Sequence, residues 1–288
     1  MTAVEARPTP GRVKLSFPGT VRGEWIKFFS LRSSYLVLSL FALVTAGFSV
    51  ISCLVMRFSE AGSAMAGSHI SELVAEFTIQ IGSLVAGVLG ALTVTNEYGS
   101  GMIRASFTAV PKRVPVVFAK ACHLIIVTAL ASAAAILLSY GAAWLLLRSE
   151  PVDIGLTTGE NPRILGGIVL FVVTIALLGL FMGLLIRSTA VSVTLVFTLV
   201  YILPALLDIV RSLVIGSAHG DYTLWRRLVL YANEVMPIAA ARPLMSWDQA
   251  TSDLPGLHLG PWTGLGVVGA WVVLFAFLGL LRLTKKDA

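Results

Sequence analysis

The fold class is decided by the stretch ILGGIVLFVVTIALLGLFMGLLIRSTAVSVTLVFTLVYILPALL, residues 164–207, which carries a single charged residue. It holds two apolar runs, Ile164 to Ile186 and Ala190 to Leu207, and only residues 187–189 separate them. A helix needs about 20 apolar residues to cross the hydrocarbon core of a membrane, so each run can span it. Because the linker is so short, the two spans are predicted to form a tight hairpin.

Four more apolar runs lie elsewhere in the chain, which is 57% hydrophobic and only 12% charged, with a mean hydropathy of +0.89. Soluble proteins carry about 25% charged residues, and no polar block here is long enough for a soluble domain. We therefore predict an all-α polytopic membrane protein with six transmembrane helices, forming one membrane domain over residues 20–288. The third run begins near Val116, so Lys120 and His123 are expected at the membrane interface. The four further predicted spans are Tyr35–Met56, Phe77–Thr95, His123–Leu147 and Trp262–Leu281.

All six lysines fall on one side of this topology. Lysine and arginine are enriched in cytoplasmic loops; eight arginines share the side of the lysines, whereas most acidic residues lie on the other. Both termini are therefore predicted to be cytoplasmic. The net charge of +6 reports this topology and not binding to nucleic acid, because the basic residues flank apolar runs. The lysines are Lys14, Lys27, Lys112, Lys120, Lys285 and Lys286.

Three segments outside the spans have distinct predicted structures. Residues 1–19 are polar with several prolines, lack the apolar core of a signal peptide, and are expected to form a flexible cytoplasmic tail. Residues 20–32 are amphipathic, with four apolar residues at helical spacing, and are predicted to lie along the membrane surface. Residues 208–261 form the longest external loop, with two semi-apolar runs predicted as interfacial or re-entrant helices. The four apolar residues of the amphipathic segment are Val21, Trp25, Phe28 and Phe29.

The second and third predicted spans are connected by a loop, residues 96–115, which contains the stretch NEYGSGMIRASFTAVPKR, residues 96–113. This stretch is more polar than a simple connection requires, holds two close glycines and ends in Pro-Lys-Arg. One interpretation is a docking surface for another protein. The other is attachment to the membrane surface, in which Glu97 caps a helix and Arg104 meets a lipid phosphate. The residues alone leave both interpretations open.

Sequence motifs for catalysis or nucleotide binding are missing from the chain. It has no Gly-x-x-x-x-Gly-Lys-Ser/Thr loop, no Gly-x-Ser-x-Gly elbow and no His-Glu-x-x-His motif. Cys53 and Cys122 lie in or beside apolar runs, and their spacing suggests neither a metal site nor a disulfide. A membrane-embedded lipid-modifying enzyme would need converging carboxylates or histidines in the spans. We therefore predict no enzymatic activity, no metal site and no cofactor site in this chain.

Two further patterns concern helix packing and the end of the fifth span. Gly179–Gly183 and Gly260–Gly264 are Gly-x-x-x-Gly pairs, which allow close contact between membrane helices. Asp208 has two interpretations: an intramembrane carboxylate with a substrate role, or a surface residue that terminates the fifth span, which we favour. Pro204, one turn earlier, can kink that span.

Two stretches resemble the permease subunits of bacterial type-2 ABC exporters, most closely the short six-span actinobacterial kind. They are RGEWIKFFSLRSSYLVL, residues 22–38, and GVLGALTVTNEYGSGMIRASFTAVPKRVPVVFAKA, residues 87–121. The shared pattern is a Glu-Trp-x-Lys opening, a second span ending in Glu-Tyr and then glycine, followed by Ile-Arg, Pro-x-Arg and Ala-Lys. The resemblance implies an elbow helix at residues 20–32 and a loop that couples the permease to an ATPase. The matching positions are Glu24, Trp25 and Lys27 in the elbow helix and Glu97, Tyr98, Arg104, Pro111 and Arg113 in the coupling loop.

The same resemblance implies how the protein would work in a bacterial plasma membrane. Two permease chains would pair, most simply as a homodimer, and each would dock a separate cytoplasmic ATPase that holds ATP and Mg²⁺. Closure of the ATPase would move the spans through the loop 96–113 and export an unidentified substrate. This substrate is expected to be hydrophobic or amphipathic, because the spans hold few charges, and the helices of residues 208–261 would cap its exit path. An alternative function is a membrane-anchored regulatory or sensor protein that recruits a soluble partner through the same loop.

Overall fold

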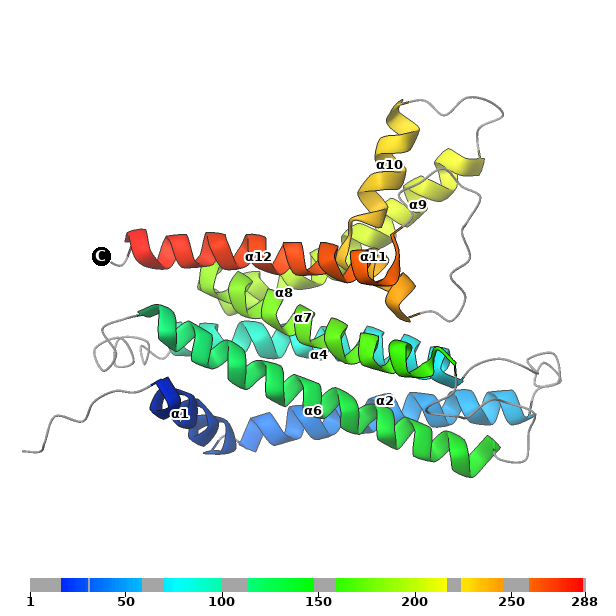
Figure 1. Ribbon diagram of the computed structural model, residues 1–288, viewed down its shortest axis with the longest axis horizontal. Coiled ribbons are helices and arrows are strands. Elements are labelled where there is room, and N and C mark those ends of the chain that lie inside the picture. Colours follow the sequence, from blue (N-terminus) through cyan, green and yellow to red (C-terminus); the bar gives the residue numbers. More distant parts are fainter. Residues whose placement is uncertain are drawn as a thin grey trace, which may run out of the picture.

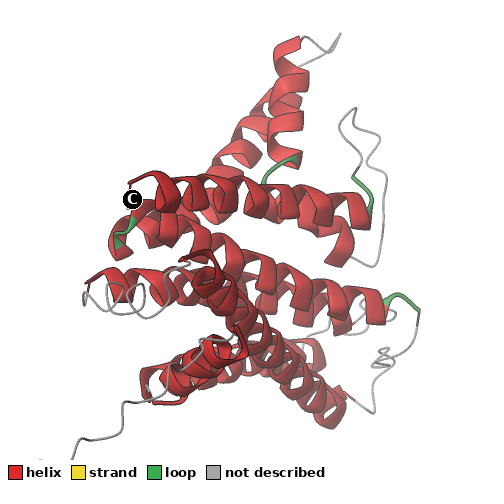
Figure 2. Ribbon diagram, turned by 60° about the vertical axis from the view of Figure 1, so that its left-hand side comes forward, coloured by secondary structure: helices red, strands yellow, loops and turns green. Residues whose placement is uncertain are grey.

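The computed structural model describes residues 17–30, 32–58, 70–99, 113–147, 159–216, 224–245 and 259–286. In these residues all regular structure is helical, and the long helices pack side by side as a bundle (Figure 1 and Figure 2). The helices are α1 (Phe17–Ser30), α2 (Arg32–Phe58), α4 (Ile70–Gly99), α6 (Arg113–Leu147), α7 (Asn161–Ile186), α8 (Thr189–Phe197), the π-helix η1 (Thr198–Ile202), α9 (Leu203–Gly216), α10 (Leu224–Glu234), α11 (Pro237–Met245) and α12 (Pro261–Lys286).

Six helical stretches of the described chain are long and apolar enough to cross a membrane, so the predicted all-α, six-span fold is confirmed. α4 and α6 begin earlier than the predicted spans, at Ile70 instead of Phe77 and at Arg113 instead of His123. Apolar length sets only the part of a helix inside the hydrocarbon, and these helices continue through polar residues beyond it. The six candidate spans are Tyr35–Val55, Thr78–Gly99, Val114–Leu147, Asn161–Ile186, Thr189–Leu213 and Pro261–Leu283.

α7 lies at the centre of the bundle, where it packs against α4, α6 and α12 (Figure 1). In an 18-residue apolar window of its span 67% of the residues are buried, against 22% in the corresponding windows of the first and fifth spans and 17% in that of the sixth. A helix that is apolar all round is expected in the interior, and Ile164, Phe171 and Ile175 are indeed fully buried. The first, fifth and sixth spans therefore present most of their surface outward.

Glycines allow α4 and α7 to approach each other closely. A Cβ atom built on Gly90 would lie 1.9 Å from a main-chain oxygen of α7, and one on Gly179 would lie 2.2 Å from a main-chain oxygen of α4. A Cβ on Gly183 would lie 3.0 Å from another main-chain oxygen of α4. The close contact predicted for the pair Gly179–Gly183 is therefore confirmed, and its partner is α4.

The second predicted pair, Gly260–Gly264, lies at the start of α12. Only Gly264 has a close helix neighbour: its Cβ would lie 1.9 Å from the main-chain oxygen of Ala240 in α11. Gly260 precedes the first residue of α12, and a Cβ there would meet only the side chain of Thr263, at 3.6 Å. Only one of the two glycines therefore allows a close helix contact, because α11 crosses α12 at Gly264.

α7 and α8 are joined by only Arg187 and Ser188, so the predicted tight hairpin is confirmed. Arg187 adopts a left-handed conformation with φ 64°, and its N–H donates a hydrogen bond to the main-chain oxygen of Gly183 at 2.9 Å. A left-handed residue at this position is a common way to end a helix. The chain can therefore reverse direction immediately and begin α8 at Thr189.

The fifth span departs from a regular α-helix. Residues Thr198–Ile202 form the π-helical turn η1, and Pro204 follows at the start of α9. Proline has no N–H to donate to the preceding turn, and the wider π turn accommodates this break. α9 then continues to Gly216, so the prediction that Asp208 terminates the span is wrong. The Asp208 carboxylate binds side chains of other helices instead of capping its own.

The two ends of the bundle carry different elements. One end holds α1, the end of α4, the start of α6, the α7–α8 turn and the C-terminal end of α12, and we call it the α1 end (Figure 1). At the opposite end, α9 and α10 form a hairpin that leans away from the bundle (Figure 1). α11 then returns the chain to α7 and α12. These three helices lie within or beside the segment 208–261, where the sequence predicts interfacial or re-entrant helices.

Candidate functional site

Four charged side chains meet at the α1 end, and we call Glu24, Lys27, Glu97 and Lys120 the four-charge cluster. They come from three helices: the first two from α1, Glu97 from the last turn of α4 and Lys120 from the second turn of α6. Lys120 Nζ donates to Glu24 Oε2 at 2.9 Å and to Glu97 Oε1 at 2.7 Å. Lys27 Nζ donates to Glu97 Oε1 at 2.9 Å and to Glu24 Oε1 at 3.2 Å. Two acids and two bases therefore balance in charge.

The four-charge cluster is largely shielded from solvent. The exposed fraction of the side chain is 4% for Lys120, 7% for Glu97 and 8% for Glu24, whereas Lys27 is 40% exposed. Buried charges are tolerated only when they are paired, so each of the three buried members depends on its partners. Glu97 Oε2 is buried without a hydrogen-bond partner among the residues described, so Oε1 alone accepts from both lysines.

Lys27 lies at the open edge of the four-charge cluster. Burial lowers the pKa of its ammonium group, but the hydrogen bond to Glu97 and the negative charges of Glu24 and Glu97 outweigh this effect and raise the pKa above its ordinary value. Lys27 therefore stays protonated at neutral pH. A group with a raised pKa stabilises the folded state below its ordinary pKa, and that stabilisation is lost only as the pH rises through the raised value.

Aromatic side chains close the cluster on the side between α1 and α6. His123, three residues after Lys120, is 5% exposed, and its ring lies edge-on to Trp25 with centroids 4.6 Å apart. Its ring centroid is 5.0 Å from that of Phe28. These contacts pack α1 against α6 and exclude water, which strengthens the neighbouring ion pairs because the local dielectric constant is lower.

α1 overlaps the predicted elbow segment 20–32, but it begins at Phe17 and ends at Ser30. Its buried residue is Glu24, so the side of α1 that faces α6 is charged at its centre. An apolar residue on the other side, Ile26, is 62% exposed. The amphipathic pattern predicts a surface helix but does not reveal that charged residues turn inward.

The four-charge cluster joins both ends of the segment that connects α4 to α6. Glu97 lies two residues before the end of α4, and Lys120 follows the start of α6 by two turns. Arg104 and Pro111, two of the predicted coupling residues, fall outside the described residues. Arg113 is the first residue of α6, and its side chain also falls outside the described part of the structure.

Tyr98 connects this region to the α7–α8 turn. It follows Glu97 in the last turn of α4, and its ring packs against the core of the bundle. The guanidinium carbon of Arg187 lies 5.0 Å from the centre of the Tyr98 ring, within the range of a cation–π interaction. Of the predicted site residues, the structure therefore groups Glu24, Lys27 and Glu97 and places Tyr98 directly beside them.

The sequence of this chain matches a known protein family over most of its length. The family model described as ABC-2 family transporter protein matches residues 24–288, which include every member of the four-charge cluster. The chain belongs to the ABC-2 transporter family. It is therefore a multi-pass membrane permease, a membrane subunit for transport. This result favours transport over the regulatory or sensor alternative. No curated protein sequence matches the chain.

Lys120 is the lysine of the Ala-Lys pair in the family pattern, but the sequence does not assign it to the site. The sequence predicts it at the membrane interface, and the structure buries it between Glu24 and Glu97. The capping interpretation of Glu97 also differs from the structure, in which its carboxylate binds two lysines of other helices. A useful signal is present nonetheless, because isolated charges in apolar runs are rare and usually functional. Glu97 and Lys120 are such charges at the facing ends of consecutive spans.

The described part of the permease holds no group of three His, Cys, Asp or Glu side chains that could bind a metal ion. Cys53 and Cys122 are both free thiols, the first buried and the second exposed. Both carboxylates of the four-charge cluster bind both of its lysines. The four-charge cluster therefore holds three helices together by electrostatic attraction.

A second polar group lies at the opposite end of the permease. Asp208 of α9 accepts a hydrogen bond from Asn233 Nδ2 at 2.6 Å and pairs with Arg242 of α11 at 3.3 Å. Arg163 of α7 donates to the main-chain oxygen of Pro243 at 2.7 Å. These contacts join α7, α9, α10 and α11. They occupy the Asp208 carboxylate, which therefore serves as a structural link between helices.

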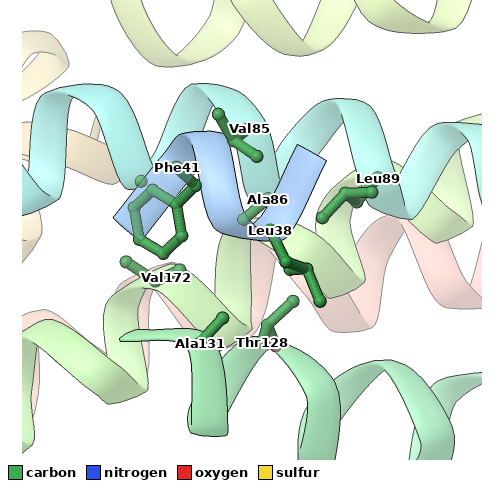
Figure 3. A pocket seen from close by; sticks show the side chains of 9 residues that line it. Leu38, Phe41, Val85, Ala86, Leu89, Thr128, Ala131 and Val172 are labelled. Carbon is green, nitrogen blue, oxygen red and sulfur yellow. The ribbon is translucent and has the colours of Figure 1, made fainter. Parts of the chain in front are cut away.

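A small, open apolar crevice lies between α2, α4, α6 and α7 (Figure 3). Thr128 is the polar side chain of its lining, and that hydroxyl already donates to the main-chain oxygen of Leu124 at 2.7 Å. The crevice therefore offers van der Waals contact but no group that could orient a polar ligand. Its lining residues are Leu38, Phe41, Gly82, Val85, Ala86, Leu89, Thr128, Ala131 and Val172.

Proposed function

We propose that this permease is the membrane subunit of an ATP-driven exporter and that its α1 end faces the cytoplasm and docks a separate ATPase. The docking element is the segment 96–113. ATP and Mg²⁺ are bound by the partner ATPase, so this chain requires no cofactor of its own. The proposed coupling residues, which occupy the positions of the family pattern, are Glu97, Tyr98, Arg104, Pro111 and Arg113.

The distribution of lysines supports this orientation in the plasma membrane. The described lysines, in α1, α6 and α12, all lie at the α1 end of the bundle, and no described residue at the opposite end is a lysine. Positive side chains are retained on the cytoplasmic side of membrane proteins. Both chain termini are then cytoplasmic. These described lysines are Lys27, Lys120, Lys285 and Lys286.

The observation that carries the proposal is that Lys120 binds both Glu24 and Glu97. The segment 100–112 follows α4 and precedes α6. The ion pairs of Lys120 connect the end of α4 and the start of α6 to α1. A push on the segment would therefore move three helices together. α4 would pass the displacement to the centre of the bundle through its close packing on α7. A partner ATPase needs this kind of stiff connection to shift membrane helices as rigid bodies.

A second permease chain, most simply an identical copy, completes the transporter in this proposal. In the 18-residue apolar windows of the first, fifth and sixth spans only 17% to 22% of the residues are buried, which leaves apolar surface for a second chain and for lipid. The proposed cargo is hydrophobic or amphipathic. Its support is the low charge of the spans, in which each 18-residue apolar window holds two Asp, Glu, Lys or Arg residues at most.

Purification of the tagged permease in a mild detergent tests the partner, and we expect a P-loop ATPase to copurify. Arg104→Ala should leave membrane insertion intact and lower stimulation of that ATPase about tenfold, since a hydrogen bond to a charged group contributes about 1.5–3 kcal/mol. Arg12→Ala, in the predicted tail, is the matched control and should match the parent protein. Normal stimulation in Arg104→Ala would contradict the docking role.

Cysteine labelling tests the orientation. The variant Arg104→Cys is made in a Cys122→Ser background, because Cys122 is exposed and Cys53 is buried. A membrane-impermeant maleimide should label position 104 in inside-out vesicles and leave it unlabelled in right-side-out vesicles. Labelling from the outer face would overturn the proposed function, since a cytoplasmic ATPase could not reach this segment.

A further inference from the structure

The turn between α7 and α8 contains an unusual backbone conformation. Arg187 has φ 64°, and it is the only non-glycine residue with a positive φ in the described part of the chain. Glycine is the residue usually found in this conformation, because a Cβ atom is disfavoured there. We therefore expect the side chain of Arg187 to make a contact that offsets the cost of this backbone conformation.

The side chain of Arg187 reaches the last turn of α4. Its guanidinium group lies over the ring of Tyr98, with 5.0 Å from the guanidinium carbon to the ring centre. Tyr98 is the neighbour of Glu97, which belongs to the four-charge cluster. The contact thus adds the α7–α8 turn to the unit that already contains α1, α4 and α6.

α8 is the element that this contact affects most. α7 is already fixed to α4 by glycine contacts along its length, so it does not need Arg187 to follow α4. The fifth span, which starts with α8, contacts α4 and α7 less extensively than these two helices contact each other. α8 also packs on α4, where Val196 lies against Gly87, and Tyr201 of η1 bonds to Ser83. These contacts lie nine or more residues beyond Arg187. α8 is connected to α7 by the short turn 187–188, whose backbone could rotate if the side chain of Arg187 did not contact Tyr98.

We propose that Arg187 is a positioning residue that makes the start of the fifth span follow the last turn of α4. This inference rests on the proposed function, because the displacement of α4 originates in the ATPase that docks on segment 96–113. The cation–π contact holds the α7–α8 turn against Tyr98, and α8 continues directly from that turn. A second described contact, from the Arg282 guanidinium to the main-chain oxygen of Leu185, joins the end of α7 to α12. It does not reach α4.

The inference is tested by measuring the movement of α8 in the complex of the permease with its copurified ATPase in lipid nanodiscs. Spin labels are placed at Ala190 on α8 and at Phe118 on α6, which are both exposed, in the Cys122→Ser background. We expect ATP with vanadate to leave the distance between the labels nearly unchanged, because α8 and α6 then move with α4 as one unit. Arg187→Gly should release α8 and increase the distance change at least threefold, whereas Arg187→Lys, which keeps a cation near the ring, should show less than half of that increase.

Two further measurements separate positioning from a general structural role. Arg187→Gly should have an unchanged or higher melting temperature, since glycine suits the left-handed backbone, and should still copurify with the ATPase. Ser188→Ala is the matched control, because the Ser188 side chain makes no capping hydrogen bond to α8, and its distance change should be as small as that of the parent protein. An equally small distance change in Arg187→Gly would overturn the inference alone. Failure of any ATPase to copurify with the parent protein would overturn the proposed function and the inference with it.

Discussion

Replacement of Lys120 by methionine should destabilise the permease more than any other single change of charge at the α1 end. Lys120→Met leaves the carboxylates of Glu24 and Glu97 buried without their shared cation, although Lys27 still touches both. Removing one partner of a buried ion pair costs about 3–5 kcal/mol. We expect a large loss of monodisperse protein in detergent and a melting temperature well below that of the parent protein.

Two variants show whether the loss comes from unpaired charge. Lys27→Met removes the half-exposed base and should cost only about 1 kcal/mol, because solvent screens exposed ion pairs. The double variant Lys120→Met, Glu97→Gln leaves Glu24 paired with Lys27, restores the charge balance and should recover most of the melting temperature. If the double variant were as unstable as Lys120→Met, the destabilisation would have to come from packing and not from charge.

Substitution of Gly90 by alanine should separate α4 from α7. The added Cβ atom would lie 1.9 Å from the main-chain oxygen of Ala176, and a backbone atom of a buried helix cannot move aside without moving the helix. Overpacking of this kind costs about 1–3 kcal/mol, and more where the backbone has to shift. The thermal unfolding midpoint in detergent, followed by size-exclusion chromatography of heated samples, measures the effect.

The matched control for this change is Gly141→Ala on α6, where a Cβ atom would meet nothing within 4 Å. Alanine is a better helix former than glycine, so this variant should be as stable as the parent protein or slightly more stable. Equal stability of Gly90→Ala and Gly141→Ala would show that the close contact between α4 and α7 is not needed for the fold.

The number of spans can be predicted from the sequence because the thickness of the hydrocarbon core fixes the length of each apolar run. The ends of the helices cannot be predicted in the same way, as the early starts of α4 and α6 show. No apolar requirement acts on residues beyond the hydrocarbon, so the pattern that marks a span stops before the helix does. The same limit explains the error at Asp208, where α9 continues because residues from α10 and α11 satisfy the carboxylate.

The candidate site is predicted only in part, for a different physical reason. Glu24, Lys27 and Glu97 stand out by their resemblance to a family pattern, but nothing in that pattern pairs them with Lys120. Pairing between helices depends on the rotation of each helix about its own axis. In a span that is apolar almost all round, the hydrophobic pattern specifies that rotation poorly. The contact of Arg187 with Tyr98 escapes prediction for the same reason, since it joins residues on two different spans.

The four-charge cluster assembles in an order that is set by the order in which the ribosome synthesises the chain. Glu24 and Lys27, three residues apart, can associate as soon as α1 emerges. Glu97 is made 23 residues before Lys120, so of the two lysines only the half-exposed Lys27 can bind its carboxylate until the next segment leaves the exit tunnel. A nascent protein truncated after the second span therefore lacks the residue that completes the four-charge cluster at its α1 end. Completion of the four-charge cluster therefore requires the start of the third span, which carries Lys120.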